Sequence, residues 1–350
     1  MALPRTRLVV YVFRRLLLLI PVLSGLLIIM FILSNLVSDP VTAYITVRTG
    51  PAEVEQIRHA HHFDDPVYVQ FFYYLIDLLR GDWGLSTSLQ YEPVTSVIVR
   101  LLPATIELAI VAIIVQIALG IPLGVVSALK KDKVLDHCSR LLALSGSSLP
   151  VFWLGLIFQY VLFYSLKSAN LPYLPSEGRI SYSVLAEHPL HTITGFLLLD
   201  SLITGNLAVF QDALVHIIMP AFVLGFAGLG LVTRITRSSM LEVMRQDYIT
   251  SARAKGLPDR VVIYKHALKN AIIPTITIVG LSFGATLGGA PITETIFSWP
   301  GLGNWAASAI LSADRAAVLS FALVAAVIII LVNLVVDVLY SLADPRLGLT

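Results

Sequence analysis

Three acidic residues interrupt long apolar stretches of this sequence, namely Glu107, Glu294 and Asp337. An ionised side chain inside a membrane is costly, so such residues usually face a water-filled cavity or a charged partner. Glu107 and Glu294 are therefore our candidates for a polar pathway, with a structural hydrogen bond inside a helix bundle as the alternative. Asp337 lies near the end of its apolar stretch, and we interpret it as a structural or interface residue.

Side chains that could bind a metal ion are clustered at His59, His61, His62, Asp64 and Asp65. Imidazole and carboxylate groups suit zinc or nickel. However, His59 and His62 share one face of a helix while His61 does not, and no cysteine joins them. We therefore favour a polar external helix over a metal site at this cluster.

A third group of residues is basic. Residues 251–274, SARAKGLPDRVVIYKHALKNAIIP, contain five lysines or arginines and one acid, whereas 13% of the whole chain is charged. The sequence MLEVMRQDYITSARAKG predicts a helix that ends at Gly256, and Pro258 then starts a second helix that runs into an apolar stretch at Pro274. The segment is predicted to be a helix–glycine–helix elbow, with a solvated basic loop as the alternative. Small side chains on one side of its first arm would permit close docking of a partner: Ser251, Ala252 and Ala254.

These residues must be positioned by helices in a membrane. The chain is 57% hydrophobic with a mean hydropathy of +0.83, and its charged fraction is well below the roughly 25% of soluble domains. A bilayer core needs about 20 helical residues. Six stretches are predicted to cross it: residues 16–36, 104–129, 141–166, 217–232, 271–297 and 316–340. We expect the first to be retained, because it is too long for a signal peptide and no small-x-small cleavage site follows.

The charge of the connecting segments predicts the topology. Residues 130–140 hold four basic and two acidic residues, and residues 234–269 hold eight basic and three acidic residues. Residues 37–102 and 167–215 have an excess of acids. Basic segments stay in the cytoplasm. Both termini and the elbow are therefore predicted to be cytoplasmic, and the two acidic segments to be external.

The sequence predicts one membrane domain over residues 1–350 with two external insertions. Residues 37–102 are predicted to form two short helices, the first starting at Pro51. Residues 167–215 include an apolar segment that is too short to span a membrane. Within the fifth apolar stretch, glycines recur every four residues, which lets helix backbones approach closely: Gly280, Gly284 and Gly288. The pattern GFAGLG at residues 225–230 is likewise interpreted as helix packing, because no strand precedes it.

The elbow resembles the EAA loop of ABC-importer permeases of the dipeptide, oligopeptide and nickel transport family. The matching positions are Gln246, Asp247, Tyr248, Ala252, Arg253, Ala254, Lys255, Gly256, His266, Ala267, Leu268, Asn270, Ala271 and Pro274. Thr250 and Lys269 depart from the pattern of the wider superfamily, as is usual in the peptide branch. Other segments are similar to the family in order along nearly the whole chain, among them RRLLLLIPVL, LLRGDWGLS, RLLPATIELA, LPVFWLGL, GGAPITETIFSWPGLG and LVNLVVDVLYSLADPR.

The resemblance implies an all-α membrane protein with the six-helix type I ABC-importer fold and no catalytic activity of its own. Its partners would be a homologous second permease subunit, one or two ATPase subunits that hold ATP and magnesium, and an external substrate-binding protein. It would bind no cofactor or metal ion and no nucleic acid, and it would reside among the lipids of a prokaryotic cell membrane. The loop segment 234–270 would couple to the ATPase through Tyr248, Ser251, Ala252, Arg253, Ala254, Lys255, Gly256 and Leu257. The loop SWPGLG borders the outer gate in this family, which gives four pathway or gate candidates: Glu107, Glu294, Phe297 and Trp299.

The cargo implied by the resemblance is a dipeptide or oligopeptide, with an oligosaccharide or nickel as alternatives. An ion-coupled secondary transporter that uses Glu107 and Glu294 would be built from inverted repeats and would need no docking elbow. A membrane hydrolase is disfavoured, because the sequence holds no H-E-x-x-H motif and no convincing Ser/His arrangement. The sequence also holds no G-x-x-x-x-G-K-[ST] phosphate loop.

Overall fold

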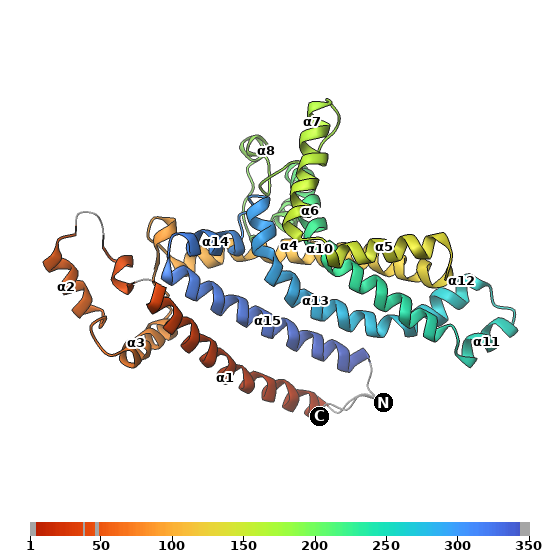
Figure 1. Ribbon diagram of the computed structural model, residues 1–350, viewed down its shortest axis with the longest axis horizontal. Helices are drawn as coiled ribbons and strands as arrows, with labels where there is room; N and C mark the ends of the chain where they lie inside the picture. Colours follow the sequence, from red (N-terminus) through yellow and green to blue (C-terminus); the bar gives the residue numbers. More distant parts are fainter. Residues whose placement is uncertain (1–4, 38, 46–48, 344–350) are drawn as a thin grey trace.

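The computed structural model describes residues 5–37, 39–45 and 49–343, and almost all of its elements are helices. The predicted all-α class is therefore confirmed. Five long helices run side by side (Figure 1): α1 (Arg5–Val37), α4 (Val94–Leu129), α10 (Leu207–Val243), α13 (Leu268–Ile296) and α15 (Arg315–Ala343). The described strands are two short ones, β1 (Leu85–Ser86) and β2 (Glu92–Pro93), which pair antiparallel.

Five helical segments are long and apolar enough to cross a membrane: Val94–Leu129, Val151–Ser168, Leu207–Val243, Asp259–Gly288 and Arg315–Val336. A shorter apolar stretch, Ile20–Leu33, lies within α1. The chain is thus a multi-pass membrane protein. Helix α4 contains 36 residues, which makes it about 54 Å long at 1.5 Å per residue, whereas a hydrocarbon core is about 30 Å thick. The ends of such a helix must project from the membrane.

The third predicted crossing, residues 141–166, is not one helix. Helix α5 (Val134–Ser148) ends before Leu149, whose ψ of 130° is extended, and α6 (Val151–Phe158) begins after Pro150. A residue before proline is pushed out of the α-helical region, which explains the break. A π-helical turn, η3 (Gln159–Ser165), and the short α7 (Leu166–Ser168) continue α6, and this arm runs across the direction of the long helices (Figure 1).

Small residues let α10 pack closely on its neighbours. A Cβ atom added to Gly225 would run into the backbone of Ala112 in α4, and one added to Gly230 would run into the backbone of Ala143 in α5. The interpretation of GFAGLG as a packing pattern is therefore confirmed. Of the three glycines that were predicted to pack closely in α13, Gly280 lies directly against Val336 of α15. A Cβ atom on Gly284 would only touch Ile329, and one on Gly288 would meet no described atom within 4 Å, so close packing within this chain does not extend to Gly288.

The two predicted helices of the first external insertion are α2 (Pro51–Ala60) and α3 (Val67–Arg80), preceded by the 3-10 turn η1 (Pro40–Ala43). The β1–β2 hairpin encloses a second such turn, η2 (Thr87–Leu89). Asp314 holds this hairpin on the start of α15, because its carboxylate accepts hydrogen bonds from the hydroxyls of Ser86 (2.7 Å) and Ser88 (2.8 Å). Asp314 also caps α15 by accepting the Ala317 N–H (3.1 Å).

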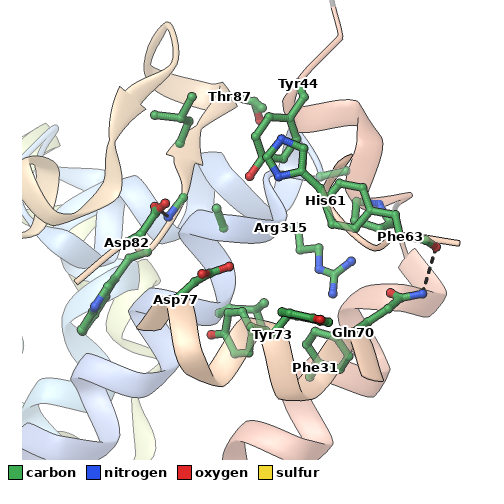
Figure 2. Close-up of a pocket in the computed structure, with 18 residues that line it drawn as sticks. Phe31, Tyr44, His61, Phe63, Gln70, Tyr73, Asp77, Asp82, Thr87 and Arg315 are labelled. Atoms are coloured by element: carbon green, nitrogen blue, oxygen red, sulfur yellow. Dashed lines mark hydrogen bonds between the residues drawn. The ribbon is translucent and has the colours of Figure 1, made fainter. Parts of the chain in front are cut away.

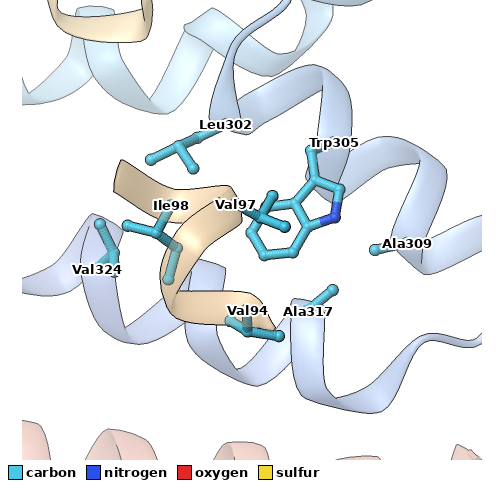
Figure 3. Packing of buried hydrophobic residues seen from close by; sticks show 8 residues of the cluster. All are labelled: Val94, Val97, Ile98, Leu302, Trp305, Ala309, Ala317 and Val324. Atoms are coloured by element: carbon cyan, nitrogen blue, oxygen red, sulfur yellow. The ribbon is translucent and has the colours of Figure 1, made fainter. Parts of the chain in front are cut away.

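A hydrophobic cluster joins α4, α14 (Leu302–Leu311) and α15 at the end of the bundle opposite the elbow. Val94, Val97 and Ile98 of α4 pack around Trp305 of α14 and against the first turns of α15, as Figure 3 shows.

The second insertion contains α8 (Tyr182–Glu187) and α9 (Leu197–Ile203). Helices α2 and α3 lie at one end of the long axis, and the basic elbow lies at the other (Figure 1). Both chain ends, residues 1–4 and 344–350, and the side chain of Asp337 lie outside the described residues.

Candidate functional site

The basic elbow consists of two helices joined at Gly256. Helix α11 (Asp247–Ala254) ends in a left-handed turn at Gly256, whose φ is +74°. The Gly256 N–H donates to the Arg253 carbonyl (2.9 Å) and the Leu257 N–H to the Ala252 carbonyl (3.4 Å), the pattern of a Schellman cap. Pro258 precedes α12 (Asp259–Val261), which continues through a π-helical turn, η4 (Val262–Ala267), into α13. The predicted elbow is confirmed in its local geometry.

Its first arm is shorter than predicted. The helix expected from Met240 to Gly256 is interrupted, because α10 ends at Val243 and Gln246 is extended, with a ψ of 147°. Gln246 then begins α11 as a separate helix, with Asp247 in its first turn where an acid suits the helix dipole. The elbow is therefore a distinct two-helix unit rather than the end of α10.

The inner face of the elbow is packed firmly on the membrane helices. Ile249 and Ala252 of α11 and Val262 of η4 are buried against Val125 and Ala128, at the end of α4. Met240 of α10 and Ala271 of α13 belong to the same cluster. Because protein interiors are close-packed and transmit strain, a displacement of the elbow must be carried into these three helices.

The outer face of the elbow is exposed. It presents Ser251, Arg253, Ala254, Lys255, Gly256 and Leu257. The prediction that Ser251, Ala252 and Ala254 share one side was wrong, because Ala252 is one turn from Ile249 and faces the core with it. Tyr248 is exposed, and its hydroxyl accepts a hydrogen bond from the Asn270 amide (2.8 Å), which links the two arms.

A buried ion pair that sequence reasoning missed lies at the same end of the bundle. Asp136 of α5 has a fully buried side chain and accepts two hydrogen bonds, each 2.8 Å long, from the guanidinium of Arg237 in α10. Ser127 of α4 donates a third at 2.5 Å, and the Asp132 N–H a fourth at 3.0 Å. The bonds from Arg237 hold the pKa of Asp136 well below its usual range, although burial opposes this shift. These contacts join α4, α5 and α10.

Glu107 is paired with the second external insertion. Its carboxylate accepts hydrogen bonds from the guanidinium of Arg179 (2.5 Å) and from the Leu198 N–H at the start of α9 (2.8 Å). Arg179 also donates to the Gly195 carbonyl (3.2 Å) and lies 5.6 Å from the ring centre of Trp299. Glu107 therefore fastens residues 179–198 to α4.

Glu294 lies near the end of α13, and its side chain is buried against the start of α14. Its Oε2 accepts the Asn304 N–H at 2.9 Å, in the first turn of that helix. Gly301 and Gly303 surround the carboxylate so closely that a Cβ atom on Gly301 would collide with it. A carboxylate at a helix N-terminus satisfies free N–H groups and complements the helix dipole.

The other two gate candidates are also buried within this chain. Phe297 packs against Leu154 and Met219, and the Trp299 indole N–H donates to the Ala104 carbonyl (3.0 Å). All four side chains proposed to line a pathway or gate are thus enclosed by the described part of this chain: Glu107, Glu294, Phe297 and Trp299. Within this chain each is held in place by a contact typical of a structural residue, and their role in a pathway or gate stays a prediction.

The three clustered histidines point to different partners. His59 lies near Asp64 (2.8 Å) and Glu55 (3.7 Å), and these three exposed residues place a ligand atom each within 4.8 Å of one another. His61 stacks on Phe63 and lies tilted against Tyr44, whereas His62 stacks on Tyr73. The histidines therefore do not converge on one point.

Comparisons with known proteins identify the family. The family described as "Binding-protein-dependent transport system inner membrane component" matches residues 120–349. The chain is 45% identical to a probable D,D-dipeptide transport system permease protein of Escherichia coli K12, over 94% of this chain and 95% of that protein. It is 41% identical to a dipeptide transport system permease protein of Alkalihalophilus pseudofirmus, over 96% and 98%. It is 35% identical to an oligopeptide transport system permease protein of Bacillus subtilis 168, again over 96% and 98%. The chain belongs to the family of inner membrane components of binding-protein-dependent transport systems.

Proposed function

We propose that this chain is one of two permease subunits of an ATP-driven ABC importer for dipeptides or oligopeptides in a prokaryotic cell membrane. A second, homologous permease would complete the pathway, an external binding protein would deliver the substrate, and one or two ATPase subunits would hold ATP and magnesium. The cargo is inferred from the relatives, whose names specify D,D-dipeptide, dipeptide and oligopeptide transport. Oligosaccharides or nickel remain the alternative cargoes.

The observation that carries the coupling proposal is the two-sided elbow. Its inner face, at Ile249, Ala252 and Val262, is buried on α4, α10 and α13. Its outer face offers small and basic side chains to a partner. An ATPase subunit that binds the outer face and changes conformation would therefore move α4, α10 and α13 together. The Asp136–Arg237 ion pair extends the same rigid unit to α5.

The coupling assignment is tested by enlarging one exposed residue of the outer face. Ala254→Trp adds a large side chain on α11 without filling the core, since Ala254 is exposed. Val134→Trp is the matched control, because Val134 is 75% exposed at the start of α5 and outside the elbow. The complete complex is reconstituted in proteoliposomes, and peptide uptake and ATP hydrolysis are measured with the loaded binding protein.

We expect Ala254→Trp to abolish peptide uptake and to abolish the stimulation of ATP hydrolysis by the loaded binding protein. The melting temperature of the permease should stay that of the wild type. Val134→Trp is expected to transport normally. Normal transport by Ala254→Trp would show that the outer face of the elbow is not the ATPase contact. If the wild-type complex hydrolyses ATP in response to the loaded binding protein but takes up no peptide, the proposed cargo is rejected instead.

A further inference from the structure

A cavity of about 130 Å³ lies at the outer end of the protein, on the far side from the elbow. Its walls come from the end of α1, the start of α15 and the first external insertion. A buried water needs only ~10–15 Å³ of such volume, so the cavity has room for a ligand of several heavy atoms. Figure 2 shows Arg315 reaching between Asp77 and Asp82 on one side and His61 and Phe63 on the other.

Two hydrogen-bond donors at this cavity lack acceptors. The Nη1 atom of Arg315 and the hydroxyl oxygen of Tyr74 are buried and have no hydrogen-bond partner in the described part of the chain. The guanidinium of Arg315 lies 4.8 Å from the ring centre of Phe31, which supplies no acceptor oxygen. Burial raises the pKa of Tyr74 to about 12, so its hydroxyl stays protonated. Buried donors in proteins are nearly always satisfied, and an acceptor is therefore missing here.

Asp39, whose charge interacts with that of Arg315, accepts hydrogen bonds from other groups. Asp39 accepts a hydrogen bond from Arg58 at 2.6 Å and another from the Val41 N–H at 3.1 Å. Arg315 is the first residue of α15, whose N-terminus is capped by the Asp314 carboxylate. This part of the cavity is complementary to a carboxylate or phosphate, which forms strong charge-assisted hydrogen bonds with a guanidinium.

The cavity wall also carries acidic and aromatic groups on the two sides of Arg315. The carboxyl groups of Asp77 and Asp82 line it, and Asp82 is fixed by the Gly84 N–H at 3.0 Å. The rings of Tyr44 and His61, whose centres lie 4.2 Å apart with a tilt of 30°, line the same space. Carboxylates and aromatic faces both attract an ammonium group. The cavity thus presents a site for an anion and a site for a cation within one small volume.

We propose that this cavity binds a small zwitterion, with its carboxylate or phosphate on Arg315 and Tyr74 and its ammonium group beside Asp77 and Asp82. Two sources offer this chemistry: a free dipeptide and the headgroup of an ethanolamine phospholipid. Both reach the external end of the molecule. The site is separate from the ATPase-coupling elbow, so the proposal stands whether or not the proposed transport function is correct.

The test uses the complete permease complex, without nucleotide and without binding protein, in nanodiscs of phosphatidylglycerol. Glycylglycine, phosphoethanolamine and inorganic phosphate are titrated separately by isothermal calorimetry. We expect saturable binding of at least one of the two zwitterions. Loss of a hydrogen bond to a charged group should weaken this binding about tenfold or more in Arg315→Gln, and a few-fold in Tyr74→Phe.

Asp77→Asn separates a zwitterion site from a plain anion site. It should weaken binding of the zwitterion and leave inorganic phosphate unaffected. Arg100→Gln is the matched control for the loss of an external arginine, because Arg100 is exposed and pairs with Glu92 away from the cavity. Preference for glycylglycine assigns the site to peptides, and preference for phosphoethanolamine assigns it to the lipid.

The proposal fails if neither zwitterion binds, or if Arg315→Gln with an unchanged melting temperature binds them as the wild type does. The assignment of the ligand as a zwitterion fails if Asp77→Asn binds the zwitterion as tightly as the wild type does. If Arg315→Gln does not fold, Tyr74→Phe and Asp77→Asn decide the outcome, because each removes only one polar function from the cavity wall.

Discussion

Asp136 of α5 and Arg237 of α10 form a two-pronged ion pair, with both N–O distances at 2.8 Å, at the end of the bundle that carries the elbow. The carboxylate is fully buried, whereas the guanidinium is 20% exposed. Removing one member of a buried pair leaves the other without compensation, which is far more damaging than loss of a surface ion pair.

Asp136→Asn is expected to lower the free energy of unfolding by about 3 kcal/mol, since it leaves the Arg237 charge without its carboxylate. The measurement is the thermal unfolding of the permease in nanodiscs. Arg140→Gln is the control, because Arg140 is exposed and lies 3.6 Å from the same carboxylate. Its expected loss is under ~1 kcal/mol. Equal losses of unfolding free energy for the two substitutions would contradict the assignment of Asp136 and Arg237 as a stabilising buried ion pair.

The contribution of Asp136 should depend on pH in one direction. Its pKa in the folded protein is lowered below the ordinary value of 3.8 by the hydrogen bonds from Arg237. The stabilisation is therefore fully present above about pH 4 and is lost as the pH falls below that value. The difference in unfolding free energy between wild type and Asp136→Asn should be constant from pH 7 to pH 5 and shrink below pH 4. A difference that grows on acidification would contradict the lowered pKa.

Gly256→Val should weaken energy coupling. The left-handed φ of +74° at this residue costs a β-branched side chain about 1–2 kcal/mol, so the turn between α11 and α12 will be distorted. Gly256→Asn is the matched variant, because asparagine tolerates this conformation. We expect fewer peptides imported per ATP hydrolysed with valine and nearly the wild-type ratio with asparagine. The same ratio in both variants would mean that the turn geometry does not matter.

Glu107→Gln should loosen the second external insertion. The change leaves Arg179, which is only 14% exposed, without its ion pair. Amide hydrogen exchange in residues 179–198 should increase, while exchange in α13 should stay unchanged. The double variant Glu107→Gln/Arg179→Gln should recover part of the lost stability, because it removes the unpaired charge. Strictly additive losses would show that the two side chains do not interact.

Gly301→Ala should destabilise the outer end of the bundle. The added methyl group would collide with the Glu294 carboxylate at the start of α14, and overpacking of this kind costs about 1–3 kcal/mol. Gly50→Ala is the control, because Gly50 has a φ of −78° and no described atom within 4 Å of its added Cβ. The melting temperature should fall for Gly301→Ala only. A wild-type melting temperature for this variant would show that the loop can move away from Glu294.

Features that depend on neighbours along the chain could be predicted from the amino-acid sequence. Apolar stretches longer than a bilayer core predicted the membrane helices, and Gly256 with Pro258 predicted the elbow, because backbone preferences act over a few residues. Helix ends were less well predicted. Helix α10 extends well beyond residues 217–232 at both ends, since polar residues continue a helix outside the hydrocarbon core.

The partners of the charged side chains could be identified only after the helices had been placed in three dimensions. Glu107 meets Arg179 across 72 positions and Asp136 meets Arg237 across 101, and neither pair leaves a local pattern in one sequence. Ala252 likewise faces the core rather than a partner, because α11 starts anew after the turn at residues 244–246. Local preferences fix each helix, whereas the pairing of buried charges depends on which helix faces come together when the helices pack.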